Sequence, residues 1–148
     1  MGKIVHARQY RWDVPTLEYK TEGTGFRAIH RQTLLGEGED EGRLNFVTRY
    51  FEIQPGGYSS LERHEHPHAV VILRGSGEVV LHDRVETVSA QDCVYVASHE
   101  WHQFHATGDE PLGFLCVVDR NRDRPQTPDD DDLAALRENP ALAARIRV

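Results

Sequence analysis

The segment from Leu61 to Gly75 reads LERHEHPHAVVILRG and carries three histidines at alternate positions before an apolar run. Seven of the nine histidines of the chain fall between His64 and His105. Neutral imidazole is the commonest side-chain ligand for transition metals in proteins. This clustering indicates a metal site built around the segment, although a polar loop can also carry histidines that only face solvent.

The surrounding sequence reads as short extended stretches separated by turn residues such as Gly, Pro, Ser and Asp. QPGGYSS, which begins at Gln54, is typical of such a turn. Even spacing of short apolar stretches is the pattern of a β-sandwich or small barrel. We therefore predict one all-β domain over residues 1–148, with its core barrel at residues 26–120. The expected strands are FRAIHRQTLL, LNFVTRYFEI, HAVVIL, GEVVLHD, DCVYVA, HQFHAT and LGFLCVVD.

The two ends of the chain differ from this pattern. Residues 1–25 are expected to form an arm that packs across one sheet. After Pro125 the sequence predicts a helical tail at residues 127–148, with Thr127 as its cap and a break near Pro140. The aspartates at residues 129–132 complement a helix dipole, so we interpret them as a helix start and solvated face rather than a metal site.

Composition excludes several classes of protein. A chain of 148 residues with 39% hydrophobic residues is globular, and its apolar run Ala69–Leu73 is too short to cross a membrane. The net charge of −7 disfavours a nucleic-acid binder, which needs a basic face. The first residues lack an apolar signal core, so we expect a cytoplasmic protein. Cys93 and Cys116 form no CxxC pair or disulfide framework.

The spacing of the histidine segment resembles the first motif of the cupin superfamily, GxxxxxHxHxxx(x)ExxxxxxG. Gly56 and Gly75 occupy the two framing glycine positions, with Glu62, His64 and His68 between them. The second cupin motif, Gly-x5-Pro-x-Gly-x2-His-x3-Asn, has the spacing of the segment from Gln91 to Ala106. Only its histidine is retained, as His102; Gln91, Ala97 and His99 replace the glycine, proline and second glycine, and Ala106 replaces the asparagine.

The resemblance implies a jelly-roll β-barrel and assigns the metal ligands by position. They are Glu62, His64, His68 and His102, a permuted set of three imidazoles and one carboxylate. Such a set suits Mn, Fe, Co, Ni or Zn with positions left open for substrate. In the alternative register, with His64 and His66 as the paired histidines, a valine would fall at the fourth ligand position.

The other histidines are not ligands in this alignment. His66 is expected to line the pocket without binding the metal. The roles of His99 and His105 stay open, whereas His30 and His82 are interpreted as ordinary strand residues.

Within the superfamily, the HEHPHAVVILRG segment, the chain length, the helical tail and Cys116 look most like the small methylsulfurylase cupins of bacterial methionine salvage. That resemblance implies transfer of the methylthio group of 1-methylthio-D-xylulose 5-phosphate to the co-substrate glutathione, which leaves the isoprenoid precursor 1-deoxy-D-xylulose 5-phosphate. It also implies Mn as the metal. Cys116 on the last barrel strand could protonate C1. Because that strand is apolar on both faces, the sequence does not show whether the Cys116 side chain points into the barrel.

The phosphate of such a substrate needs a cationic partner, and the sequence offers several. Arg49, Arg63 and the arginines of the RNRDR stretch at residues 120–124 are all candidates, and no spacing selects among them.

Two other functions remain open at this point. A metal-dependent cupin dioxygenase acting on a small enolisable or phenolic substrate would use the same four ligands. A non-catalytic cupin that binds a small molecule is the second alternative. We also expect a homodimer, because an arm and a closing strand that is apolar on both faces leave surface that a monomer would expose.

Overall fold

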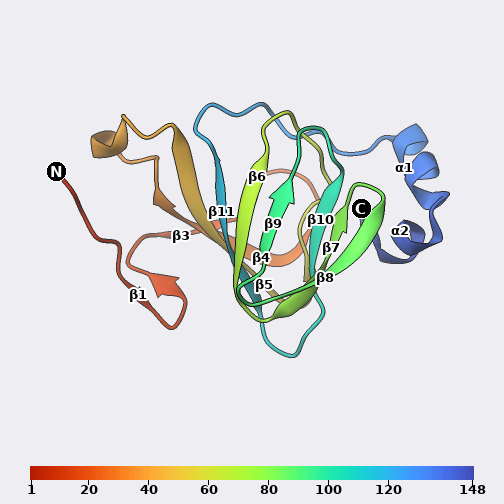
Figure 1. The fold of residues 1–148 in the computed structure, drawn as a ribbon, viewed down its shortest axis with the longest axis horizontal. Coiled ribbons are helices and arrows are strands. Elements are labelled where there is room, and N and C mark those ends of the chain that lie inside the picture. Colours follow the sequence, from red (N-terminus) through yellow and green to blue (C-terminus); the bar gives the residue numbers. More distant parts are fainter.

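The structure is a computed structural model that describes all of residues 1–148, and it consists mainly of one antiparallel sheet that curls on itself (Figure 1). The predicted all-β barrel is confirmed. The sheet has the order β8-β7-β10-β5-β11-β6-β9, and β4 and β3 add to it beside β5. Its strands are β3 (Thr16–Glu18), β4 (Arg27–Leu35), β5 (Phe46–Tyr58), β6 (His68–Arg74), β7 (Ser76–Leu81), β8 (Arg84–Ser89), β9 (Cys93–Val96), β10 (His102–Ala106) and β11 (Leu112–Asp119), and a 3-10 turn, η1, spans Glu39–Glu41.

The long strand β5 holds the two halves of the curled sheet together. Its first part pairs with β11, and Tyr58 at its end pairs with His105 of β10. The sequence predicts a turn at QPGGYSS, but the strand continues through it. Gly56 has φ +79, and a Cβ on Gly57 would meet the carbonyl oxygen of Arg27 at 2.5 Å. Two adjacent glycines therefore let the strand bend and change partners without ending.

The core lies between the two curled halves and follows the two-residue period of the strands. On β11, Leu112, Phe114, Cys116 and Val118 face inward and are buried. The rings of Phe51, Phe104 and Phe114 stack at centroid distances of 5.5 and 4.6 Å. These aromatic rings form the apolar base of the cavity in which the histidines lie.

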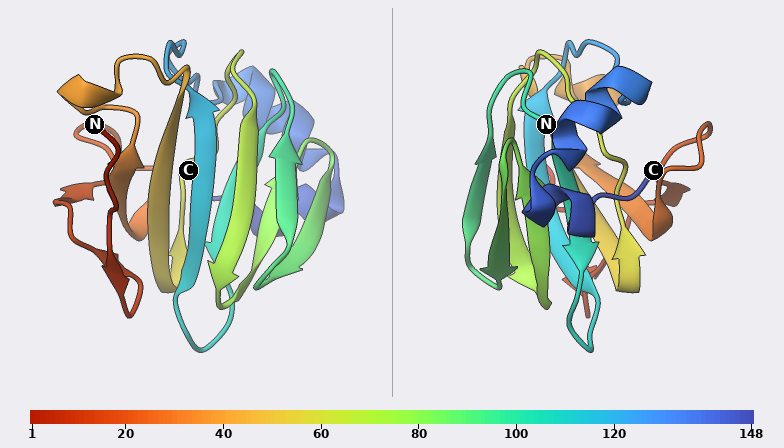
Figure 2. Two further views of the ribbon diagram at one scale, coloured as in Figure 1. Left: turned by 60° about the vertical axis from the view of Figure 1, so that its left-hand side comes forward. Right: turned by 90° about the vertical axis from the view of Figure 1, so that its right-hand side faces the viewer.

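The N-terminal arm covers the outer face of β4 and β5, as predicted (Figure 2). It contains a two-stranded hairpin of β1 (Ala7–Arg8) and β2 (Arg11–Trp12), and β3 then pairs with β4. Arg11 donates both terminal nitrogens to the buried carboxylate of Glu52, at 2.9 and 3.0 Å. The arm then turns toward the barrel, where Tyr19 and Lys20 line the main pocket.

The tail forms two short helices, α1 (Asp130–Arg137) and α2 (Pro140–Arg145), at the end of the molecule opposite the arm (Figure 1). The predicted break at Pro140 is confirmed. The predicted cap at Thr127 is wrong, because Gln126 pairs with Arg63 in a β-bridge and keeps the chain extended there. Asp129 is the cap instead: its side chain accepts from the Asp132 N–H, and Asp132 reciprocates.

The tail packs on the outer side of β7 and β10. The contacting side chains form a second apolar cluster, made of Leu61, Val80, Trp101, Leu142 and Ile146. No helix in the structure is long and apolar enough to span a membrane.

The strand register corrects one further expectation and places Cys93. His82 does not lie within a strand, because it occupies the two-residue turn between β7 and the unexpected strand β8 with φ +57. Cys93 is exposed. It belongs to the outward set of β9, where the inward positions are taken by Val94 and Val96.

Candidate metal centre

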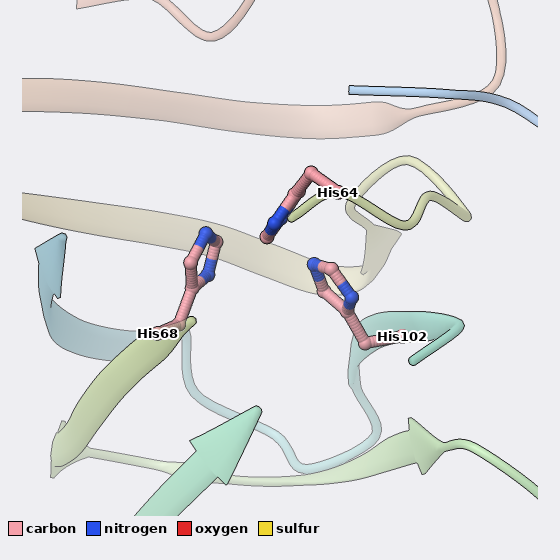
Figure 3. A group of neighbouring side chains, drawn as sticks. All are labelled: His64, His68 and His102. Carbon is pink, nitrogen blue, oxygen red and sulfur yellow. The ribbon is translucent and has the colours of Figure 1, made fainter. Parts of the chain in front are cut away.

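Three imidazoles from separate parts of the chain point toward one another (Figure 3). His64 comes from the loop before β6, His68 is the first residue of β6, and His102 is the first residue of β10. One ring nitrogen from each residue lies within 4.8 Å of the other two, and all three residues are buried. The spacing that suggested a metal site in the sequence thus places three of the four expected ligands together.

The hydrogen bonds of these rings leave one nitrogen of each facing the others. The Nδ1–H of His64 donates to the His66 carbonyl oxygen at 2.6 Å, and that of His102 donates to the Glu100 carbonyl oxygen at 2.9 Å. The Nε2 atoms of His64, His68 and His102 are buried and have no hydrogen-bond partner. Buried polar atoms without partners are rare in proteins. Three such lone pairs directed at one point fit a transition metal.

The electrostatics of the cluster favour the neutral form that a metal ligand must have. Burial lowers the pKa of His64 to about 4, and the neighbouring His102 and His66 add to the effect. Burial also lowers the pKa of His68 and that of His102. The three rings are therefore unprotonated at neutral pH and can offer their lone pairs.

Glu62 lies beside the imidazoles but is not one of the three converging groups. Its backbone N–H and carbonyl pair with those of His102, which places the two side chains on the same side of this short ladder. Both side chains line the same pocket. The Glu62 carboxylate forms an ion pair with Lys20 from the N-terminal arm. Sequence reasoning did not anticipate Lys20, which reaches the site from 42 residues away in the chain.

His66 lies next to the cluster and is held by a carboxylate. Its ring stacks on that of His64 at a centroid distance of 3.7 Å, and its Nδ1 lies 2.6 Å from Asp123 Oδ1. Asp123 also accepts from the backbone N–H groups of Glu65 and His66. Although burial opposes the effect, these hydrogen bonds hold the pKa of Asp123 well below its usual range. His66 therefore faces the pocket from outside the three converging groups.

His99 and His105, whose roles the sequence did not decide, lie outside the pocket. His99 has φ +63, and its backbone N–H donates to the His64 carbonyl oxygen at 2.7 Å. His105 faces the C-terminal tail, and its Nε2 lies 3.0 Å from the side-chain oxygen of Gln103. His30 lies within β4, as expected.

Cys116 faces the interior of the barrel, which answers the question that its strand left open. The residue is 1% exposed and lines the pocket together with His68 and His102. Arg49 Nη2 lies 3.6 Å from its sulfur. Burial raises the pKa of the thiol, and the Arg49 guanidinium only partly opposes this shift. Cys116 is therefore a protonated thiol at neutral pH, placed in the cavity that holds the histidines.

The comparisons with known proteins agree with this architecture. The family model of the cupin domain (Cupin_2) matches residues 49–118. A protein from Rhodospirillum rubrum named 1-methylthio-D-xylulose 5-phosphate methylsulfurylase is 48% identical over 138 residues, covering 92% of this chain and 86% of that protein.

Two solved structures with cupin titles are also similar. A cupin 2 conserved barrel domain protein from Rhodopseudomonas palustris has a TM-score of 0.90 and 40% identity, covering 99% of this chain and 100% of that chain. A cupin 2 domain-containing protein from Halorhodospira halophila has a TM-score of 0.78 and 54% identity, covering 97% of this chain and 94% of that chain. The curled barrel, the converging histidines and these similarities agree, and the chain belongs to the cupin family.

Proposed function

We propose that this chain is a metal-dependent methylsulfurylase, which transfers the methylthio group of 1-methylthio-D-xylulose 5-phosphate to glutathione. The observation that carries the proposal is the 48% identity, over 92% of this chain, to the Rhodospirillum rubrum protein of that name. The pocket supports it, because a buried thiol, a cluster of neutral imidazoles and two guanidinium groups line one cavity. These are the groups that a phosphorylated ketose losing sulfur from C1 would need.

We assign Glu62, His64, His68 and His102 as the metal ligands and Mn as the expected metal. The unpartnered Nε2 atoms support the three imidazoles, and the shared ladder with His102 supports Glu62, whose carboxylate would exchange Lys20 for the metal. When bound, the metal would supply Lewis-acid polarisation of the substrate C2 carbonyl.

The transfer balances as a displacement at sulfur. The glutathione thiolate forms an S–S bond with the methylthio sulfur, and the C1–S bond breaks with its electron pair remaining on the sugar as an enolate. A proton is then added at C1. The products are 1-deoxy-D-xylulose 5-phosphate and the mixed methyl disulfide of glutathione. No net proton is consumed, because glutathione loses one for each proton that C1 gains.

Cys116 is the group that we assign as the proton donor to C1. Burial keeps its thiol protonated, which is the form that a general acid requires. The strand register fixes Cys116 opposite Arg49 and Val70, so the thiol has a rigid setting. The aromatic base of the cavity would keep bulk water from the enolate carbon.

The direct test is product identification with protein purified without a histidine tag and loaded with Mn. In deuterated buffer, NMR should show 1-deoxy-D-xylulose 5-phosphate with one deuterium in its new methyl group. One mixed methyl disulfide should form per sugar, without oxygen uptake at an electrode. Protein stripped by a chelator should be inactive. Conversion that consumes oxygen and proceeds without glutathione would replace the proposal with the dioxygenase.

A further inference from the structure

The pocket holds two guanidinium groups whose positions separate them from the other arginine candidates. Arg49 points inward from the middle of β5, and Arg122 reaches the same pocket from the loop after β11. Arg63 instead lies over the Trp101 ring at 4.4 Å. Arg120 donates to the Glu41 carbonyl oxygen, and Arg124 has 88% of its side chain exposed.

The charge of these two groups is poorly balanced. Arg49 forms no ion pair, and its Nε is buried without a hydrogen-bond partner. Arg122 has one carboxylate in range, Glu37, whose side chain is 46% exposed and lies 3.7 Å away. The two carboxylates of the pocket already have partners: Glu62 pairs with Lys20, and Asp123 lies 2.6 Å from His66 Nδ1. Positive charge therefore accumulates on the Arg49 and Arg122 side of the cavity.

Both guanidinium groups are held in place by other contacts. Arg49 Cζ lies 4.9 Å from the Phe51 ring centroid, and its Nη2 contacts the Cys116 sulfur. Arg122 Nη1 donates to the Asp119 carbonyl oxygen at 2.9 Å. Burial and the neighbouring Arg49 both lower the pKa of Arg122, so the two cations disfavour each other when no anion lies between them. Preorganised guanidinium forks suit the oxygen atoms of a phosphate.

We propose that Arg49 and Arg122 form the subsite that binds the phosphate group of the substrate, a phosphate monoester of a short ketose. This assignment rests on the proposed function for the identity of the sugar, but the anion site itself follows from the two guanidinium groups, of which Arg49 has no carboxylate partner and Arg122 has only the half-exposed Glu37. A carboxylate of glutathione has related chemistry, and the experiment below separates the two sources.

The test compares ligands with and without the phosphate on Mn-loaded protein. Isothermal titration of the wild type should show far tighter binding of 1-deoxy-D-xylulose 5-phosphate than of 1-deoxy-D-xylulose. Arg122→Gln and Arg49→Gln should each weaken the phosphorylated ligand by about 10- to 100-fold, the worth of a charge-assisted hydrogen bond. Binding of the unphosphorylated sugar should change by less than about threefold. Arg124→Gln, a substitution in the same loop as Arg122 but outside the pocket, is the matched control and should bind like the wild type.

The other outcomes overturn either the subsite or the proposed function, and they distinguish the two. Variants that fold, as judged by circular dichroism, and still bind the phosphorylated sugar like the wild type would reject the subsite. If the two arginine variants have a higher KM for glutathione but bind the phosphorylated sugar like the wild type, the arginines bind a carboxylate of glutathione instead of the phosphate. A wild type that binds the phosphorylated sugar through these arginines, but transfers no methylthio group, would reject the proposed function and keep the subsite. If the protein transfers the methylthio group, but neither arginine substitution changes the affinity for the phosphorylated sugar, the proposed function stands and the subsite is rejected.

Discussion

Two single residues of the second cupin motif replace glycines but keep a positive φ, which is the backbone conformation that glycine adopts most easily. Gln91 and His99 occupy the two glycine positions, and they have φ +80 and +63. Residues other than glycine adopt this left-handed region at a cost of about 1–2 kcal/mol. The motif spacing survives in this chain because the backbone geometry survives, even where the residue types do not.

A substitution that restores glycine at Gln91 should therefore stabilise the protein. Relief of the left-handed strain exceeds the extra chain entropy of glycine, so we expect Gln91→Gly to raise the free energy of unfolding by about 0.5–1 kcal/mol. Urea denaturation monitored by circular dichroism measures the change. Ala90→Gly is the matched control in the same turn, because Ala90 has no positive φ and should lose stability instead. Equal effects of the two substitutions would show that the strain at Gln91 is negligible.

The metal site makes a prediction that separates ligands from neighbours. Elemental analysis should find about one divalent metal ion per chain in the wild type. His102→Ala should lose the metal, because it removes one of three converging lone pairs. His66→Ala should retain it, since His66 Nδ1 is committed to Asp123. Glu62→Gln should weaken metal affinity by about tenfold or more if the carboxylate is the fourth ligand. Loss of metal in His66→Ala would contradict the proposed ligand set.

The sequence predicted the three imidazoles of the site. It did not predict Lys20 and Asp123, which bind the neighbouring residues Glu62 and His66. His64, His68 and His102 were predictable because their spacing matches a motif. Lys20 and Asp123 were not, because each meets the site from a distant segment and has no local pattern around it. Asp123 stands among the three arginines of the RNRDR stretch, where no motif marks its carboxylate. The weakly balanced charge of Arg49 and Arg122 is likewise a property of the folded pocket alone.

At the scale of elements, the period-two alternation of apolar residues located most of the barrel strands. It failed where other forces decided the conformation. The end of β5 stays in the sheet through glycines that permit a bend, and β8 has polar residues at most of its outward positions. The tail was recognised from its acidic start, but its first residue was set by the bridge between Arg63 and Gln126.

The docking of the tail on β10 gives a pH-dependent prediction. Burial lowers the pKa of His105 to about 4, with Arg145 and Arg147 of the tail adding to the effect. An exposed histidine in the unfolded chain titrates near 6.5. Between these two pH values the unfolded state binds more protons than the folded state. The contribution of neutral His105 to the free energy of unfolding is therefore complete above about pH 6.5 and is lost as the pH drops toward 4. The contribution at stake is about 3 kcal/mol.

The variant His105→Gln isolates this contribution, because glutamine can keep a hydrogen bond to Gln103 without titrating. Thermal unfolding of Mn-loaded protein at several pH values should show a weaker acid destabilisation for His105→Gln than for the wild type. His6→Gln, a substitution at an exposed residue of the arm, is the control and should follow the wild type. Parallel pH curves for all three proteins would remove His105 from the account.

At the scale of the whole molecule, one face of the barrel stays uncovered. The arm covers β4 and β5 and the tail covers β7 and β10, but the outer face of β6, β9 and β11 has no such cover (Figure 2). Its outward side chains are mostly apolar, and Tyr95 is 66% exposed. Uncovered apolar faces commonly mark interfaces. The apolar residues that face outward here are Ala69, Val71, Leu73, Cys93, Tyr95, Leu115 and Val117.

We therefore expect a homodimer that buries this face. Light scattering of the purified protein should give twice the chain mass of 16.9 kDa. Tyr95→Glu should shift the mass to that of one chain, because it places a charge within the apolar interface. Leu17→Glu, on the exposed strand β3 of the arm, should leave the dimer intact. A monomeric wild type would reject the dimer.

If Cys116 protonates C1 in a pocket organised by the metal ligands, the turnover rate of Cys116→Ser in Mn-loaded protein must show the loss of that acid. Serine is a far weaker acid than a thiol, so turnover with 1-methylthio-D-xylulose 5-phosphate and glutathione should fall by about 10²- to 10⁴-fold, while metal content and substrate affinity stay unchanged. Cys93→Ser, at an exposed thiol outside the pocket, should retain full activity. A Cys116→Ser protein as active as the wild type would show that Cys116 is not the proton donor.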